Sequence, residues 1–421
     1  MLNFFLKYIF FLLGFFRSFF VVINTKTYER DVSSVIFSSA FGHKITNLDY
    51  LARIFKNNKV LVFWIKYNET NNYLLEIYSN YLSYVFINLI SRNFSKNNDI
   101  LSYEGLGIQK GLNFFLSFSN NNYHITDSSI LYKMLNPFNE RMQVYDFKNN
   151  LIKKKYDTFY SHEFLINKIS LNDLGLNKNS ITTVKNFLEK NIDINNLKIA
   201  YFLFRNERHN YTEKHDILRD SGNIKNYKAA IIYLLENNYS VFYSGSDKLL
   251  LDNNIYKNFF DLDKADISSD LLNIYLLLHS DFIVSQHSGP IHLCNIFKTP
   301  IVFTDFLPLW QGSCGEKDIF LPKKFYDRVN NREVSLKQIF IDYKKLFFGA
   351  YDYYKNIDIL DSSESDILDA VTEMNLQLFD KEFSLNSIED KLNNYYDLVP
   401  KPSLHHMRKN RITIKKLKEN F

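Results

Sequence analysis

Strand-like and helix-like segments alternate regularly between residues 197 and 306. Apolar runs such as KIAYFLFR, YSVFYSG and DFIVSQ are each followed, within a short stretch, by a segment with helical spacing, such as YKAAIIYLLENN or SSDLLNIYLLLHS. This order is typical of βαβ units, in which helices cover both faces of a parallel sheet. We therefore expect an α/β, doubly wound, Rossmann-like domain over residues 196–340.

A second α/β domain is expected over residues 25–195. VSSVIFSSA predicts a strand, ITNLDYLARIF a helix and VLVFWI a buried strand, which again makes a βαβ unit. Within this domain we expect residues 73–90 and the segment TTVKNFLEKN to be helical, and EGLGIQKG to form a turn. Residues 341–421 are expected to be a mostly helical segment that ends in a solvated or frayed basic tail, for which contact with a membrane surface is the alternative.

Length and composition narrow the class of protein. The 421 residues suggest two or three domains. A formal net charge of +5, spread along the chain, argues against a dedicated nucleic-acid binder. The two cysteines, Cys294 and Cys314, exclude a disulfide framework and favour a reducing cytoplasm.

Residues 4–23 are almost wholly apolar. Their length fits a membrane-spanning helix of about 20 residues. Two cations oppose simple spanning, because each one at a helix centre costs about 2.5–3.5 kcal/mol. On a helix the polar residues form a thin stripe, made of Asn3, Lys7, Gly14 and Ser18, with Arg17 beside it.

We therefore expect residues 1–24 to be an anchor helix that lies in the membrane interface, with its cations on anionic headgroups. A spanning helix and a buried helix of a globular domain are the alternatives. A cleaved signal peptide is disfavoured, because no small-residue cleavage site follows.

Candidate ligand-binding residues follow the predicted strands, since ligands bind beyond the carboxyl ends of the strands in open α/β sheets. In the N-terminal domain these residues are Gly42 and His43. In the C-terminal domain they are Arg205 after the first strand, Ser244 and Gly245 after the second, and Ser285, Gln286, His287, Ser288 and Gly289 after the third.

The segment SQHSGPIHL is the most informative of these. Ser288 and Gly289 make a tight turn, and Pro290 takes an early helical position where its missing N–H costs nothing. The N–H groups of the first helical turn, with the helix dipole, form an anion site that suits a diphosphate. His287 and His292 stand on either side. An ordinary helix cap after a strand is the alternative.

Three further side chains are candidates for chemistry. The guanidinium of Arg205 can bind a phosphate through two hydrogen bonds, although a surface or interdomain salt bridge is the alternative. Arg219 offers either a second phosphate contact or an ordinary loop charge. The imidazole of His43, with an ordinary pKa of about 6.5, can accept a proton from an acceptor hydroxyl, or it is a structural histidine.

Several other chemistries lack their motifs. The sequence contains no G-x-x-x-x-G-K-[ST] and no G-x-G-x-x-G after a strand, which leaves nucleoside triphosphatases and dinucleotide enzymes without support. Asp261 and Asp263 have D-x-D spacing, but they precede a predicted helix and are expected to be capping or surface residues. We therefore expect no metal and no cofactor.

The segment SQHSGPIHLCNIFKTPIVF resembles the donor site of bacterial glycosyltransferases with the GT-B fold. It is especially similar to the lipopolysaccharide heptosyltransferases, in which Ser/Thr-Gly-Pro-x-His-Leu is followed by Thr-Pro and a strand. The strand that ends in Arg205, RDSGNIKNYKAAIIYLLENNYSVFYSG, SDLLNIYLL and DILDAVTEM extend the resemblance to putative bacterial surface-polysaccharide glycosyltransferases over residues 200–375.

The resemblance implies two Rossmann-like domains that face a cleft, and transfer of a sugar from a nucleoside diphosphate sugar to a hydroxyl of a surface-glycan precursor. It implies that Ser288, Gly289 and His292 line the diphosphate site and that Arg205 binds a phosphate. Inversion at the anomeric carbon is also expected from the family. His287 and His43 stand where the family usually has acidic residues.

The expected partners are the donor, a glycan or lipid-linked glycan acceptor and the cytoplasmic face of the inner membrane, but no nucleic acid. Two alternatives remain for the function. One is a nucleotide-sugar epimerase or hydrolase on the same fold, and the other is a non-catalytic membrane scaffold.

Overall fold

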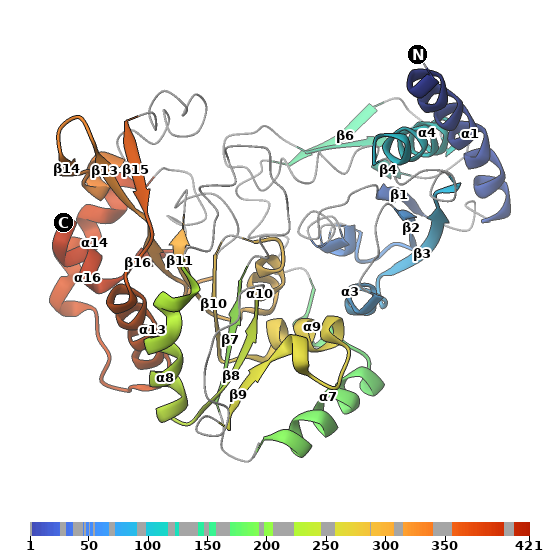
Figure 1. Ribbon diagram of the computed structural model, residues 1–421. Helices are drawn as coiled ribbons and strands as arrows, with labels where there is room; N and C mark the ends of the chain where they lie inside the picture. Colours follow the sequence, from blue (N-terminus) through green and yellow to red (C-terminus); the bar gives the residue numbers. More distant parts are fainter. Residues whose placement is uncertain are drawn as a thin grey trace. The chain divides into compact units, whose positions relative to one another are not determined.

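The computed structural model divides the chain into two compact units, Met1–Asn177 (unit 1) and Lys178–Phe421 (unit 2), each described here by itself (Figure 1). The sequence placed this boundary between residues 195 and 196. The structure describes residues 2–25, 31–36, 45, 48–49, 51–53, 55–66, 72–90, 98–116, 123–125, 142–146, 151–156, 169–192, 198–204, 223–245, 257–286, 288–306, 315–339, 356–399 and 408–421.

Unit 1 is built on a six-stranded sheet with the order β3-β2-β1-β4-β5-β6. Strands β1 to β4 pair in parallel, and β5 and β6 are added antiparallel at one edge. The elements are α1 Leu2–Asn24, β1 Val32–Ile36, β2 Val60–Lys66, α3 Asn72–Ile77, β3 Leu82–Asn88, α4 Asn98–Leu116, β4 Tyr123–Ile125, β5 Met142–Asp146, β6 Leu151–Tyr156 and the 3-10 helix η3 Leu171–Asp173.

The prediction of one helix over residues 73–90 is wrong for its second half. Only α3 is helical, and β3 pairs in parallel with β2 from Leu82 opposite Val60 onwards. β3 reads LSYVFIN, which is rich in the β-branched and aromatic residues that favour strands. Helical periodicity over a short apolar run does not separate a helix from a buried strand.

The prediction of a turn at EGLGIQKG is also wrong, because this segment lies inside α4. Its glycines mark a helix–helix contact. A Cβ atom built on Gly107 would lie 2.1 Å from the carbonyl oxygen of Phe11, and one on Gly111 would lie 2.4 Å from that of Phe15. Glycine lets the two backbones approach this closely, so α1 packs directly along α4.

The polar stripe of α1 lies against α4 at Gly14 and Ser18, and Arg17 beside it also bonds within unit 1. Ser18 is fully buried, and a Cβ atom on Gly14 would lie 2.5 Å from the carbonyl oxygen of Glu104. Arg17 Nη1 donates to the carbonyl oxygen of Asn88 at 2.6 Å and to Glu104 Oε1 at 3.4 Å. Arg17 therefore bonds to α4 and β3.

α1 is long and apolar enough to cross a membrane by length and composition alone. Only 17% of its window Leu6–Asn24 is buried, so the alternative of a buried globular helix does not describe it. A signal sequence near an N-terminus has the same length and composition.

Unit 2 is built on a seven-stranded parallel sheet with the order β16-β12-β11-β10-β7-β8-β9, as the alternating pattern predicted. Its elements up to β12 are α7 Lys178–Asn191, β7 Lys198–Leu203, η6 Ile224–Tyr227, α8 Lys228–Glu236, β8 Tyr239–Ser244, β9 Phe259–Asp261, η7 Leu262–Lys264, α9 Ser269–His279, β10 Phe282–Ser285, α10 Ile291–Phe297, β11 Ile301–Phe306 and β12 Ile319–Pro322. A small antiparallel sheet, β14-β13-β15, and further helices follow: β13 Lys324–Asp327, β14 Arg332–Glu333, β15 Ile357–Leu360, α13 Glu364–Phe379, η8 Asn386–Ile388, α14 Glu389–Leu398, β16 Arg411–Ile412 and α16 Ile414–Asn420.

Helices cover both faces of this sheet (Figure 1). α8 and α13 pack on one face and α7, α9 and α10 lie on the other. On the first face, inward residues of β7 such as Ala200 and Phe202 meet Ile231 of α8 and Val371 of α13. These fully buried side chains form the main core of the unit.

The prediction of a solvated basic tail is wrong for residues 408–421. β16 pairs in parallel with β12, and Ile412 and Leu417 are fully buried. Arg411 bonds through Nη1 to Glu373 and through Nη2 to Gln377 Oε1 at 2.6 Å, both on α13. The stretch after residue 340 also contains strands: β15 pairs with β13 in the small antiparallel sheet, and β16 lies at the edge of the seven-stranded sheet.

Candidate functional site

The strand order of unit 2 has a switch point between β7 and β10. From β7 the chain moves outward through β8 and β9, and it then returns to the other side of β7 with β10, β11 and β12. In open α/β sheets the ligand crevice lies beyond the carboxyl ends of the strands at such a point. The candidate site therefore lies beyond Leu203 of β7 and Ser285 of β10.

Ser285 joins these two strand ends. Its hydroxyl donates to the carbonyl oxygen of Leu203 at 2.8 Å and lies 3.0 Å from that of Gln286. Its side chain is fully buried. Ser285, a predicted donor-site residue, thus bonds within the sheet. Its hydrogen bond to Leu203 holds the end of β10 beside the end of β7.

A buried polar network lies beside the carboxyl ends of β10 and β11. Gln286 Nε2 donates to Tyr227 Oη at 2.9 Å and to Thr304 Oγ1 at 3.3 Å, and these two hydroxyls are 2.8 Å apart. Tyr227 Oη also donates to Asp305 Oδ2 at 3.3 Å. Asp305 Oδ1 accepts from the N–H of Ser362 at 2.6 Å, so the network reaches the start of α13.

The hydroxyl of Tyr227 in this network is protonated and uncharged. Burial, and then the nearby charge of Asp305, raise the pKa of Tyr227 well above its usual range. Burial also raises the pKa of Asp305, against an opposing effect of Lys323. Asp305 has a φ of 50°, a left-handed backbone conformation that is uncommon for a non-glycine residue and costs free energy.

Two atoms near the carboxyl ends of these strands, Gln286 Oε1 and Ser288 Oγ, are buried and have no hydrogen-bond partner among the described residues. Buried polar atoms are normally hydrogen-bonded to protein or water. This edge of the sheet therefore offers hydrogen-bonding capacity to a polar ligand.

The Ser-Gly-Pro turn lies between β10 and α10, as the sequence predicted. Pro290 has a φ of −59°, which suits its position at the start of the helix. The N–H groups of His292 and Leu293 donate to the carbonyl oxygens of Gly289 and Pro290 at 3.3 and 3.0 Å. Those two N–H groups are used within the turn, so an anion would meet the N–H groups that precede them.

The carboxyl end of β8 carries Ser244 and Gly245. A Cβ atom on Gly245 would lie 2.6 Å from Tyr243 Oη and 3.2 Å from the Cβ atom of Phe204, both on buried side chains. The carbonyl oxygen of Ser244 accepts from the N–H of Phe204 at 2.8 Å. Gly245 thus lets β8 pack closely against the end of β7.

The other predicted site residues lie outside the described residues: Arg205, Arg219, His287, Gly42 and His43. Phe204, the residue before Arg205, is described and follows β7 directly. In unit 1, β1 has β2 on one side and β4 on the other, which makes a second switch point ahead of Gly42 and His43. The roles of all five residues stay predictions.

The interpretation of Asp261 and Asp263 as capping or surface residues is confirmed, with Asp261 as the cap and Asp263 exposed. Asp261 Oδ1 accepts from the N–H of Asp263 at 3.2 Å at the start of η7, and its other oxygen pairs with Lys264 at 3.0 Å. Within the described part of the chain, no three His, Cys, Asp or Glu side chains are arranged to hold a metal ion.

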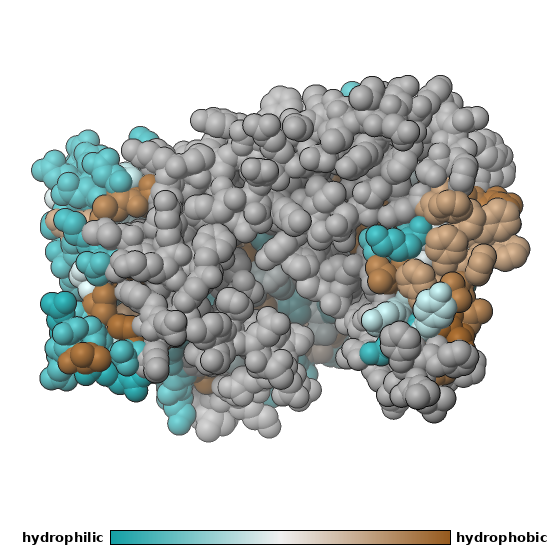
Figure 2. Space-filling model, turned by 90° about the horizontal axis from the view of Figure 1, so that it is seen from above, coloured by the Kyte–Doolittle hydropathy of each residue, from teal (hydrophilic) through white to brown (hydrophobic). Residues whose placement is uncertain are grey.

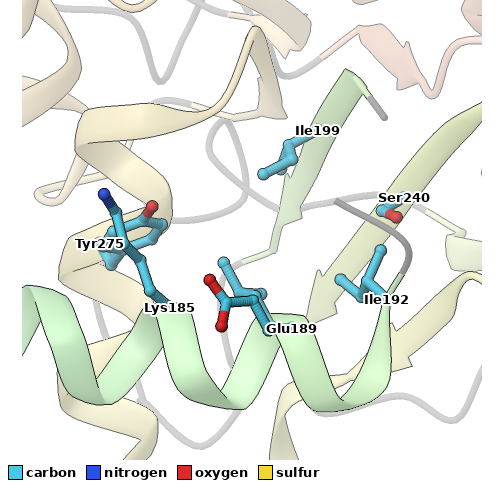
Figure 3. A pocket seen from close by; sticks show the side chains of 7 residues that line it. Lys185, Glu189, Ile192, Ile199, Ser240 and Tyr275 are labelled. Atoms are coloured by element: carbon cyan, nitrogen blue, oxygen red, sulfur yellow. The ribbon is translucent and has the colours of Figure 1, made fainter. Parts of the chain in front are cut away.

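A pocket of about 200 Å³ lies near the amino ends of the strands of unit 2, opposite their carboxyl ends (Figure 3). It is lined by Ile199 near the start of β7 and Ser240 near the start of β8, with Lys185 and Glu189 of α7 and Tyr275 of α9. Because this is the amino end of the strands, the pocket is separate from the candidate site.

Comparison with known proteins finds similar solved structures. No family model and no curated protein matches this chain. Among solved structures, it is similar to a glycosyl transferase family 9 protein from Veillonella parvula, with 12% identity, coverage of 82% of this chain and 98% of that chain, and a TM-score of 0.44.

The chain is also similar to the ADP-heptose lipopolysaccharide heptosyltransferase II of E. coli, with 13% identity, coverage of 69% and 90%, and a TM-score of 0.39. It is similar as well to the UDP-GlcNAc 2-epimerase of Neisseria meningitidis, with 14% identity, coverage of 82% of this chain and 99% of that chain, and a TM-score of 0.32.

Sequence reasoning missed Tyr227, Thr304 and Asp305. Thr304 and Asp305 lie near the carboxyl end of β11, so the rule that selected residues after three strands would also have selected them. Tyr227 precedes α8, and no local pattern signals that its hydroxyl reaches across to β10 and β11.

Proposed function

We propose that this chain is a glycosyltransferase that moves a sugar from a nucleoside diphosphate sugar to a hydroxyl of a bacterial surface-glycan precursor. One observation carries the proposal: the strand order of unit 2 puts its switch point between β7 and β10, the strands that lead into Arg205 and into Ser288–Gly289. The sequence alone predicts these residues as phosphate ligands, because they follow strands of an open α/β sheet.

The proposed reaction is a displacement at the anomeric carbon. The acceptor oxygen forms the new bond, the bond to the diphosphate breaks, and His43 takes the proton of the acceptor hydroxyl. Arg205 and the turn before α10 stabilise the negative charge on the leaving diphosphate, without a metal and with inversion.

Around this centre, donor contacts are proposed for Arg219, Ser244, Gly245, His287, Ser288, Gly289 and His292, and Ser285 is proposed to position the residues that follow it. Gly42 and His43 are on the acceptor side. Two Rossmann-like domains that share a cleft, as in the GT-B fold, and a location at the cytoplasmic face of the inner membrane belong to the same proposal.

The experiment is a transfer assay with the detergent-solubilised full chain. It supplies UDP-, GDP-, ADP- and dTDP-sugars, with and without a lipid-linked glycan extract, and measures nucleoside diphosphate release and product mass. We expect release that depends on the extract and is lost in Arg205→Ala. The matched control is Arg332→Ala, which removes an exposed guanidinium from β14.

Two outcomes would overturn the proposal. Turnover of the donor without any acceptor would indicate an epimerase or a hydrolase. Transfer that Arg205→Ala leaves near normal would exclude the phosphate role of Arg205.

A further inference from the structure

The outward face of α1 is aromatic, aliphatic and largely exposed. Phe16 and Phe20 are 61% and 63% exposed, and Tyr8 and Ile23 are each 58% exposed. Leu12, Leu13 and Phe19 lie on the same arc of the helix and are also exposed. A monomeric soluble protein rarely leaves this much contiguous apolar surface in water.

α4 extends this surface. Tyr103, Leu106 and Phe114 are exposed along one side of α4. The two helices interlock through aromatic rings, with Phe15 and Phe114 centroids 5.8 Å apart and Phe19 and Phe115 centroids 5.1 Å apart. We call these exposed apolar residues of α1 and α4 the α1–α4 face; Figure 2 shows hydrophobic atoms gathered where Figure 1 draws the two helices.

Among the described side chains of α1 and α4, the exposed charge is positive. α1 contains no Asp or Glu. The carboxylate of Glu104 is buried and pairs with Arg17. Lys110 of α4 is exposed, and Lys7 Nζ lies 5.4 Å from the centroid of the Tyr103 ring. Anionic lipid headgroups complement such cations.

We propose that the α1–α4 face docks on an anionic lipid bilayer, with its aromatic side chains at the headgroup–acyl boundary and α1 still packed on α4. The occupant is lipid for two reasons. The window Leu6–Asn24 has membrane-like length and a mean hydropathy of 1.9, and the exposed cation Lys110 favours an anionic partner. Among the described side chains, the same face of a second copy would offer no exposed carboxylate, because α1 has none and Glu104 is buried.

The packing of α1 decides how it meets the bilayer. Gly14, Gly107 and Gly111 bring its backbone against α4, and Arg17 bonds to the carbonyl oxygen of Asn88. A spanning α1 would have to give up these contacts. The protein therefore binds as a peripheral protein, through two helices of unit 1. This deepens the proposed membrane location and does not depend on glycosyl transfer.

The test is flotation of the full chain with vesicles of phosphatidylcholine alone or with a quarter phosphatidylglycerol. The variant Phe16→Ser/Phe20→Ser removes two exposed rings. The control Val329→Ser/Leu360→Ser removes two exposed apolar side chains from unit 2. Lys110→Glu tests the charge. Thermal unfolding of each variant checks that it is folded.

We expect binding to the anionic vesicles that falls at least about tenfold in the Phe variant and is within about twofold of normal in the control. Lys110→Glu should weaken binding by about fivefold or more, and alkaline carbonate should release the bound protein. Normal flotation of the Phe variant, equal flotation with neutral vesicles, resistance to carbonate, or a Phe variant that changes only the oligomeric state would each overturn the proposal. Nucleoside diphosphate binding in detergent is independent of all four results.

Discussion

The hydroxyl of Ser285, at the end of β10, donates a 2.8 Å hydrogen bond to the carbonyl oxygen of Leu203, at the end of β7. These are the two strands on either side of the switch point in unit 2. The bond fixes the strand ends from which Arg205 and Gln286 continue. We propose that a nucleoside diphosphate binds just beyond that bond.

Tyr227 is the centre of the buried network behind this edge. Tyr227→Phe removes the hydroxyl that accepts from Gln286 and lies 2.8 Å from that of Thr304. We expect a loss of about 1–3 kcal/mol in the free energy of unfolding, because buried polar groups lose their partner. Urea unfolding measures it. Tyr326→Phe, whose hydroxyl bonds to Asn331 at the surface, should cost less than about 0.5 kcal/mol, and an equal loss in both variants would contradict this account.

The folded C-terminal segment depends on a buried ion pair. Arg411 and Glu373 are 4% and 9% exposed, and the second Glu373 oxygen accepts from the N–H of Ile414 at 2.8 Å. Arg411→Ala leaves Glu373 buried without its cation, so we expect a loss of about 3–5 kcal/mol and early proteolysis near residue 408. If limited proteolysis cleaves Arg411→Ala no faster than the original protein, the ion pair between β16 and α13 does not stabilise residues 408–421.

The glycines of α4 are predicted to be needed for packing. A side chain at Gly107 would overlap the backbone of Phe11, so Gly107→Val should destabilise unit 1 by about 1–3 kcal/mol or displace α1. The neighbouring Leu106 points outward, and Leu106→Ala should have little effect. Hydrogen exchange of α1 amides distinguishes the two variants, and slow exchange in both would show that α1 does not need this contact.

Asp318 predicts a pH dependence in unit 2. Burial raises the pKa of Asp318 to about 7, although its carboxylate accepts from the N–H groups of Gly315 at 2.5 Å and Ile301 at 2.9 Å. The unfolded pKa is about 3.9. The folded state therefore binds the proton more tightly, and this contribution is complete below pH ~4 and is lost as the pH rises to ~7.

The measurement is urea unfolding at pH 5 and pH 7.5. We expect the original protein to lose a few kcal/mol at most relative to Asp318→Asn across this range, at ~1.4 kcal/mol per pKa unit. Asp390→Asn, an exposed carboxylate of α14, is the control and should follow the original protein. An Asp318→Asn variant with an unchanged pH dependence would show that this carboxyl does not titrate there.

The sequence predicted the parallel sheet of unit 2 well, because its strands are apolar on both faces and its helices are short and regular. The same pattern located Ser288–Pro290 at a strand end. It failed where local and tertiary preferences differ. β3 looked helical by spacing, Gly107 and Gly111 looked like turn residues, and β16 looked like a polar tail.

Those failures share a cause. The sequence does not show which backbone packs against a glycine. It also does not show that a charged residue such as Arg411 pairs with the buried Glu373. Tyr227 is missed for the same reason, because its partners Gln286 and Thr304 are 59 and 77 residues away. Such partners are set by tertiary packing.

The most direct test is a thermal-shift measurement of the detergent-solubilised full chain with UDP, GDP, ADP, CMP and dTDP. A ligand that binds only the folded state raises the melting temperature by mass action. We predict a selective shift with one nucleoside diphosphate that is lost in Arg205→Ala and kept in Arg332→Ala. No shift with any nucleotide, or one that Arg205→Ala preserves, would contradict a diphosphate site at the switch point between β7 and β10.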